Sequence, residues 1–351
     1  MSIETSVPRH SPLVVVGASA GGVEALSGFV AGLPADLRAT VLVVLHMSAD
    51  SPSALATILR RRSALPVRQA TDGELLVAGQ VLVARPDHHL VVGGDRVILT
   101  HGPKENGHRP AVDVLFRSAA RSAGPRAFAV VLSGALDDGA AGALSVHGGG
   151  GAVAVQDFEE ALYPSMPQSA AAAVDSARRG TVAELASLVA AWVADLPEAD
   201  PHLEDELTEL EMEVEMARMD PVAVHDPDRP GTPAGFGCPD CGGSLYRIEE
   251  GDLVRFRCRV GHAWSPESLL ARQSVELEGA LWIALRSLEE KAALNAELGE
   301  RAQTIGHDRT AARFAKNADE VSDAAELVRR LIVQLGEAAA GQQSTGPSAD
   351  A

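Results

Sequence analysis

Short apolar runs rich in β-branched residues alternate with segments of helical spacing through the first 196 residues. Helical spacing is seen in residues 21–32, 51–62, 110–123, 168–174 and 182–196, and in the segment that ends at Val146. Four runs are apolar throughout, which is typical of strands buried on both faces: Leu13–Val16, Val41–Leu45, Phe128–Leu132 and Ala152–Val155. The alternation predicts an α/β domain with a doubly wound, mostly parallel sheet over residues 12–196.

Residues 66–100 follow a different pattern, in which short apolar runs are separated by turn residues. The runs are Leu75–Val77, Val81–Ala84, Leu90–Val92 and Val97–Leu99. Gly93-Gly94-Asp95 separates the last two and is typical of a β-hairpin turn. This region is therefore interpreted as a β-excursion off the main sheet.

Residues 197–235 are rich in acidic residues and proline, which predicts a linker. Residues 197–228 carry 12 acidic side chains and one basic side chain. Leu203, Leu207, Leu210 and Val214 recur at intervals of three and four, so part of the linker is expected to form an amphipathic helix. Such a charge run more often is a solvated spacer than a ligand-binding feature.

The C-terminal quarter of the chain is predicted to form two long helices joined by a turn. Ser265-Pro266 is typical of an N-cap followed by proline at the first helical position. The spacing in residues 265–336 predicts a helical hairpin with coiled-coil-like seams, which pack on each other or form a homodimer. Residues 337–351 are rich in Ala, Gly, Ser and Gln and are expected to be disordered.

Charge and cysteine content narrow the class of protein. The net charge is −18, which argues against nucleic acid as a partner. No apolar run reaches the ~18 residues of a membrane helix, and we find no signal peptide. Three cysteines, all between positions 238 and 258, do not suggest a disulfide framework. We expect a cytoplasmic protein that is not inserted in a membrane.

The cysteines form a motif with the spacing of a zinc ribbon. Cys238 and Cys241 make one pair, and Cys258 and His262 make the other. This set suits tetrahedral Cys₃His coordination with no open position, so residues 236–264 are predicted to hold a structural Zn²⁺. The alternative is a redox-sensitive thiol cluster without metal.

A serine lies in a glycine-flanked turn after the first apolar run, Gly17-Ala18-Ser19-Ala20-Gly21-Gly22. Helix N-terminal amides at such a turn favour developing negative charge, so Ser19 is a candidate nucleophile. The alternative is that Ser19 only caps the following helix.

Two further strand ends carry polar residues. His46 directly follows Val41–Leu45, and Asp137-Asp138 follow the run that ends at Leu132. The structural alternative for His46 is a histidine whose hydrogen bonds are satisfied within the protein, and the alternative for Asp137 or Asp138 is a cap on the following helix. Because parallel strands end at the same edge of a sheet, a Ser, a His and an Asp can meet there as a triad.

Four other histidines receive a structural interpretation. His88 and His89 are near a strand end, where surface or packing roles outweigh a role in a cleft. His101 and His108 flank a loop that contains Gly and Pro and are taken as loop residues.

At these residues the chain resembles the chemotaxis-type protein-glutamate methylesterase (CheB-type) family over about residues 12–195. The resemblance rests on Gly17–Gly22, His46-Met47 and Leu132–Gly142, with further likeness in Ala84–His89, Arg109–Phe116 and Tyr163–Pro167. It implies a serine esterase that hydrolyses glutamate γ-methyl esters on chemoreceptors, with a methyltransferase as the counterpart that forms these esters. Some members also deamidate glutamine. No catalytic cofactor is implied.

The resemblance assigns roles to individual residues. Ser19 would be the nucleophile, His46 the general acid/base and Asp138 the residue that orients it, while the backbone amides of Ala20 and Ala135 would form the oxyanion hole. The family often has Thr where Ala20 stands and Asn where Asp137 stands. Many members carry an N-terminal receiver domain, and the motif begins too early here for one to be expected.

A non-catalytic alternative remains open. In it, the zinc ribbon and the helical hairpin bind a partner, and the chain is a signalling or scaffold protein.

Overall fold

The computed structural model describes residues 12–50, 54–196, 208–220, 231–251 and 253–344. The chain forms two compact units, residues 1–269 and 270–351. Among the described residues, no helix combines the length and apolarity needed to cross a membrane. The predicted positions Leu203 and Leu207 lie outside the described residues.

Unit 1 is built on a seven-stranded sheet in which every neighbouring pair is parallel. In sheet order the strands are β3 (Val67–Gln69), β4 (Gln80–Val83), β2 (Thr40–Leu45), β1 (Leu13–Ala18), β7 (Ala127–Val131), β8 (Ala152–Gln156) and β9 (Arg178–Gly180). The first strand of the chain is thus central, with β2 on one side and β7 on the other. This arrangement puts the ends of β2, β1 and β7 side by side.

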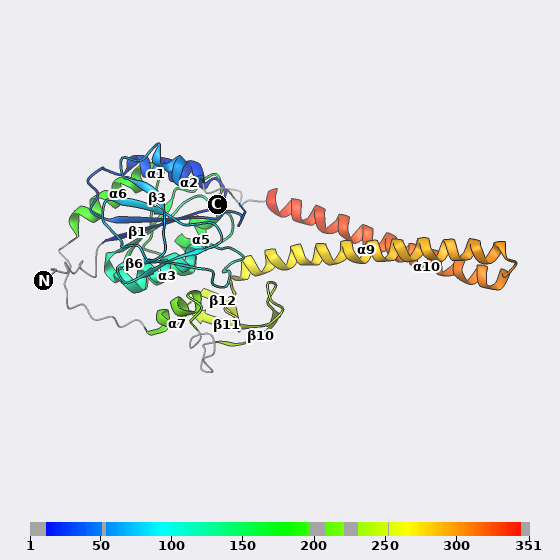
Figure 1. Cartoon of the computed structure of the whole chain (residues 1–351). Helices are drawn as coiled ribbons and strands as arrows, with labels where there is room; N and C mark the ends of the chain where they lie inside the picture. Colours follow the sequence, from blue (N-terminus) through cyan, green and yellow to red (C-terminus); the bar gives the residue numbers. More distant parts are fainter. Residues whose placement is uncertain (1–11, 51–53, 197–207, 221–230, 252, 345–351) are drawn as a thin grey trace. The chain divides into compact units, whose positions relative to one another are not determined.

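Helices cover both faces of this sheet (Figure 1). Side chains alternate along β1, so Val14 and Val16 face one layer and Val15 the other. The first layer holds α1 (Gly22–Gly32), α2 (Leu55–Arg60) and α6 (Val182–Asp195); the second holds α3 (Val112–Ala123), α4 (Ala140–Gly148) and α5 (Ser165–Ala173). A short 3-10 helix, Gly124–Arg126, joins α3 to β7. The predicted doubly wound α/β fold is confirmed.

The region 66–100 only partly leaves the main sheet. β5 (His89–Gly93) and β6 (Arg96–Thr100) form a separate antiparallel hairpin, and Gly93 pairs with Arg96 across the predicted turn. β3 and β4, however, extend the main sheet. The β-excursion interpretation was wrong for Val81–Ala84, because an all-apolar run paired with β2 is buried within the sheet.

A small antiparallel sheet follows the connector. It contains β10 (Thr232–Gly237), β11 (Ser244–Glu250), β12 (Leu253–Cys258) and β13 (Ala263–Trp264). Its core includes Leu245, Phe256 and Trp264. We call residues 232–264 the ribbon.

The acidic connector contains more structure than a solvated spacer would. Residues Thr208–Ala217 form α7, and β10 already begins within the predicted linker. Glu213 of α7 is only 8% exposed and forms ion pairs with Arg117, Arg255 and Arg257. The spacer interpretation was wrong at this residue, because three arginines neutralise its charge inside the protein.

Unit 2 is a helical hairpin formed by α9, Pro266–Thr304, whose first turn belongs to unit 1, and α10, Asp308–Ser344. Leu285, Ala325 and Ile332 form its buried seam. α10 extends beyond residue 336 into the segment expected to be disordered.

Candidate functional site

The three candidate catalytic residues follow three adjacent parallel strands. Ser19 directly follows β1, His46 directly follows β2, and Asp138 lies in the loop after β7. Backbone hydrogen bonds continue the sheet past the strand ends, from His46 N to Ala18 O (3.1 Å) and from Ser19 N to Ser133 O (2.9 Å). The site therefore lies at the carboxyl edge where the strand order reverses, which is where ligands bind in open α/β sheets.

The three side chains form a continuous hydrogen-bonded relay. Nδ1 of His46 lies 3.1 Å from Oγ of Ser19, and Nε2 of His46 lies 2.6 Å from Oδ2 of Asp138. The side chains of His46 and Asp138 are only 5% and 2% exposed. Because a carboxylate can only accept, Nε2 carries the ring proton, and Nδ1 is left free to accept the proton of Ser19.

Neither helix-cap alternative matches the geometry. The N-cap of α1 is Gly21 (φ +70°) without a side-chain cap hydrogen bond, so Ser19 does not cap that helix. The N-cap of α4 is Gly139, also without one, so neither Asp137 nor Asp138 caps α4. The hydroxyl of Ser19 is left to His46.

Asp138 is held by four donors. Its Oδ2 accepts from the amide of Val112 (2.7 Å) in addition to His46, and its Oδ1 accepts from the amide of Asp113 and from Nδ2 of Asn106, both at 3.1 Å. The two amides begin α3, whose dipole favours negative charge. Burial opposes ionisation, but the hydrogen bond and charge of His46 outweigh it and hold the pKa of Asp138 well below its usual range.

Asp113 mirrors Asp138 across the same helix end. Its Oδ1 accepts from the amides of Gly139 (3.0 Å) and Gly142 (2.7 Å), and its Oδ2 accepts from Nδ2 of Asn106 (3.1 Å). Burial and the charge of Asp138 raise the pKa of Asp113 well above its ordinary value. Each carboxyl thus ties its own loop or helix to the other element, and Asn106 bridges the two.

His108 stacks on the ring of His46. The ring centroids are 3.7 Å apart with an angle of 8° between the planes. Burial, with His46 as a second cause, lowers the pKa of His108 to about 4. A neutral His108 therefore covers one face of His46 near pH 7 without adding charge. The interpretation of His108 as a simple loop residue was incomplete.

The predicted oxyanion amides belong to Ala20, which follows Ser19, and to Ala135, which follows Gly134. Within the described part of the chain, the amides of Ala20 and Ala135 donate no hydrogen bond, so both are available to a substrate. The turn is tightly packed: a Cβ on Gly134 would lie 2.9 Å from Cβ of Ser19 and 2.0 Å from Sδ of Met166. Such packing restricts Ser19 to a narrow range of positions.

The hydroxyl of Ser133 links the turn after Ser19 to the segment that contains Tyr163. Oγ of Ser133 donates to the carbonyl of Ala20 (2.8 Å) and accepts from the amide of Tyr163 (3.0 Å). The amide of Ser133 donates to Oε1 of Gln156 (2.9 Å). These contacts fix the loop after β7 against the Ser19 turn.

The four predicted metal ligands meet at one end of the ribbon. The ligand atoms of Cys238, Cys241, Cys258 and His262 all lie within 4.8 Å of one another. Sγ of Cys241 is 3.6 Å from Sγ of Cys258, and Nδ1 of His262 is 3.6 Å from Sγ of Cys258 and 3.8 Å from Sγ of Cys238. Ligands on a tetrahedral zinc ion would be about 3.5 to 3.8 Å apart, so the set fits this ion.

Sequence reasoning missed Asn106 and His108, which contact Asp138 and His46. Both lie in the loop before α3, where no periodic pattern points to them. His89 has the packing role that was favoured: it lies between the carbonyl of Pro103 (2.9 Å) and the amide of Ala111 (3.2 Å).

Comparison with known proteins places the α/β domain in one family. The family model described as CheB methylesterase matches residues 14–189. The protein-glutamate methylesterase/protein-glutamine glutaminase 2 of Methanosarcina mazei is 39% identical over 163 residues, which cover 44% of this chain and 44% of that protein. The corresponding protein 1 of Anaeromyxobacter dehalogenans is 39% identical over 194 residues, covering 53% and 55%. The chain thus spans about half the length of these curated relatives.

Among solved structures, the CheB methylesterase catalytic domain of Thermotoga maritima has a TM-score of 0.49 and 31% identity. It covers 52% of this chain and 98% of its own.

Proposed function

Because this chain belongs to the CheB methylesterase family, we propose that it is a serine esterase that hydrolyses glutamate γ-methyl esters. The observation that carries the proposal is the relay from Ser19 through His46 to Asp138, with contacts of 3.1 and 2.6 Å. A non-catalytic scaffold has no need of a hydroxyl, an imidazole and a buried carboxylate in this order.

In the first half of the reaction, Oγ of Ser19 attacks the ester carbonyl while Nδ1 of His46 takes the hydroxyl proton of Ser19. Asp138 stabilises the imidazolium that forms and keeps the ring in its orientation. The oxyanion of the tetrahedral intermediate accepts from the amides of Ala20 and Ala135. The imidazolium then returns the proton to the leaving methoxide, and methanol departs from a glutamyl ester of Ser19.

The second half uses the same groups on water. His46 takes a proton from water as its oxygen attacks the glutamyl ester, and Ser19 leaves with that proton. The product is a free glutamate. A glutamine side chain would react in the same way with ammonia as the leaving group, which is consistent with the double name of the relatives.

We place the substrate on a chemoreceptor or a related signalling protein, where a methyltransferase must first form the ester. The names of the relatives support a protein substrate.

A cytoplasmic location is consistent with thiols that have to stay reduced to bind metal. Exposed Trp282 and Ile283 on α9, at 53% and 61%, support self-association of the hairpin as a dimer; sedimentation of the full chain tests this.

For Cys238, Cys241, Cys258 and His262 we propose a structural zinc site. All four positions are occupied by protein ligands, so no site is left for substrate or water on the metal. The metal would hold the ribbon together and would not contact the reacting atoms of the acyl transfer.

Methanol release from methyl-labelled receptor membranes tests the activity. Wild type should release methanol, and Ser19→Ala should reduce the rate to background. Ser27→Ala is the matched control, because the hydroxyl of Ser27 donates a hydrogen bond to the carbonyl of Val23 in its own helix and is not part of the relay. Equal release by wild type and Ser19→Ala would reject the esterase and favour the scaffold alternative.

A further inference from the structure

Asn106 contacts the relay on one side and the chain after the ribbon on the other. Its Nδ2 donates to Oδ1 of Asp138 and to Oδ2 of Asp113, each at 3.1 Å. Its Oδ1 accepts from the amide of Ser265 (2.8 Å) and lies 3.0 Å from Oγ of Ser268. The side chain is only 8% exposed, so all of its hydrogen-bonding capacity is used inside the protein.

Ser265 and Ser268 cap the start of α9 with reciprocal hydrogen bonds. The amide of Ser265 donates to Oγ of Ser268, and the amide of Ser268 donates to Oγ of Ser265, both at 3.0 Å. This reciprocal capping fixes both hydroxyls. Oγ of Ser265 also donates to Oδ1 of Asp137 (2.7 Å), the neighbour of the relay carboxylate.

The backbone around Asn106 joins the ribbon as well. The amide of Asn106 donates to the carbonyl of Ala263 (2.8 Å), and the amide of Ala263 donates to the carbonyl of Lys104 (3.3 Å). Ala263 directly follows the ligand His262. The loop that carries Asn106 and His108 therefore lies between the metal-ligand end of the ribbon and the relay.

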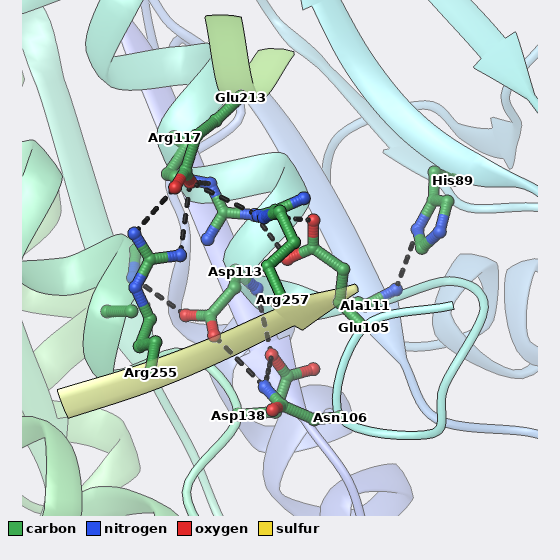
Figure 2. A network of polar contacts seen from close by, with 12 residues as sticks. His89, Glu105, Asn106, Ala111, Asp113, Arg117, Asp138, Glu213, Arg255 and Arg257 are labelled. Carbon is green, nitrogen blue, oxygen red and sulfur yellow. Dashed lines mark hydrogen bonds and ion pairs between the residues drawn. The ribbon is translucent and has the colours of Figure 1, made fainter. Parts of the chain in front are cut away.

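A buried ion network holds the ribbon in this position. Glu105 pairs with Arg117 of α3 and with Arg257 of β12, while Glu213 of α7 pairs with Arg117, Arg255 and Arg257. All five side chains are 11% exposed or less. Figure 2 shows this network next to Asn106, Asp113 and Asp138. These charges neutralise one another inside the protein, so replacing one of them by a neutral residue would leave its partners buried and unpaired, which is costly.

We propose that Asn106 is a positioning residue for Asp138, and that the ribbon and the Ser265–Ser268 turn hold it in place. This rests on the proposed esterase function. The two amides of α3 donate one to each oxygen of the carboxylate, and Asn106, from outside the parallel sheet, is the second donor to Oδ1. The ribbon thus takes part in the precise orientation of His46, whatever it does for substrate recognition.

Labelling of Ser19 by a fluorophosphonate tests the proposal in the full chain without the natural substrate. Oγ of Ser19 forms a bond to phosphorus, fluoride leaves, and His46 takes the hydroxyl proton. Asn106→Ala should slow labelling about 10- to 100-fold, and Ser268→Ala about 3- to 10-fold, because they remove a charged and a neutral hydrogen bond respectively. Ser268→Thr keeps the hydroxyl and should recover most of the rate.

Ser274→Ala is the matched control, since the hydroxyl of Ser274 is exposed and donates a hydrogen bond to the carbonyl of Leu270 in its own helix. In methanol release, Asn106→Ala should lower kcat and leave KM within about twofold. If the ribbon only recruits the substrate, Asn106→Ala should instead raise KM and leave the rate of labelling unchanged.

The outcomes separate the two proposals. Unlabelled wild type would overturn the esterase assignment and this inference with it. Labelled wild type with equal rates for folded Asn106→Ala and Ser268→Ala would overturn this inference alone. If Asn106→Ala does not fold, Ser268→Ala decides, because it leaves Asn106 in place.

Discussion

Replacing Asp138 by asparagine should remove most of the turnover, whereas the same replacement at the adjacent Asp137 should not. Both oxygens of Asp138 face donors: His46 and the amide of Val112 at Oδ2, and Asn106 with the amide of Asp113 at Oδ1. An asparagine has an NH₂ group in place of one oxygen. In either orientation that group faces two N–H donors and no acceptor.

The magnitude follows from the contacts that are lost. With NH₂ toward His46, Nε2 must become the acceptor and Nδ1 then carries the proton, so the ring cannot deprotonate Ser19. With NH₂ toward Asn106, two hydrogen bonds to a charged acceptor are lost, each worth about 1.5 to 3 kcal/mol. In both cases the imidazolium loses its counter-charge. We expect kcat to fall by roughly 10² to 10⁴.

Asp137→Asn is the matched control. Oδ1 of Asp137 accepts from Oγ of Ser265 (2.7 Å), and an amide oxygen can do the same. Burial, with the charges of Glu267 and Asp138 adding to it, raises the pKa of Asp137 to about 7. Much of it is therefore already neutral at pH 7, and kcat should stay within about threefold of wild type.

The same pKa predicts a stability effect with a definite sign. A folded pKa above the unfolded value means that the native state binds more protons between about pH 4 and 7, so wild-type stability falls as pH rises through this window. Asparagine removes that loss. The melting temperature of Asp137→Asn relative to wild type should therefore rise from pH 4 to 7 and then level off.

The assay is methanol release with kcat and KM determined separately, after thermal unfolding has shown that both variants are folded. Turnover by Asp138→Asn within threefold of wild type would refute the relay. A loss at Asp137→Asn as large as at Asp138→Asn would refute the choice between the two aspartates.

Three further predictions concern packing, the ion network and the metal. Gly134→Ala, whose Cβ would lie 2.0 Å from Sδ of Met166, should lower kcat about tenfold or more, whereas Gly148→Ala, where a Cβ meets nothing within 4 Å, should not. Glu213→Gln should cost about 3 to 5 kcal/mol of unfolding free energy at pH 7. Because the ion pairs lower the pKa of Glu213, this difference in urea unfolding should shrink as pH falls below about 4.5. Purified wild type should contain about one zinc per chain; Cys238→Ser should lose it and take the fluorophosphonate label as slowly as Asn106→Ala.

The parallel sheet and the relay could be predicted from the sequence for one shared reason. A strand buried on both faces is apolar along its whole length, so the first polar residue after it stands out, as Ser19 and His46 do. Parallel strands then bring these residues to one edge without further information. The choice of Asp138 over Asp137 had no such basis in the pattern and came from family resemblance.

Asn106, His108 and Glu213 could not be predicted because nothing local marks them. Ser265 and Asn106 are 159 positions apart in the chain, and loop residues show no periodicity that would bring them together. Glu213 lies among other acidic residues of the connector, and nothing in the sequence marks it as the one that faces three arginines. A charge run predicts solvation on average, and a single tertiary contact overrides it.

The residues that support Asp138 extend further along the chain than the family match does. The match ends at residue 189, yet Asn106 accepts its hydrogen bonds from Ser265 and Ser268. A buried carboxylate stays ionised only while enough donors face it, and the two amides of α3 and the ring of His46 are donors that the α/β domain supplies by itself. The fourth donor is the flexible side chain of Asn106, which has to be fixed by its own partners before it can fix the carboxylate. In this chain those partners follow the ribbon, so the ribbon completes a site whose reacting atoms all belong to the α/β domain.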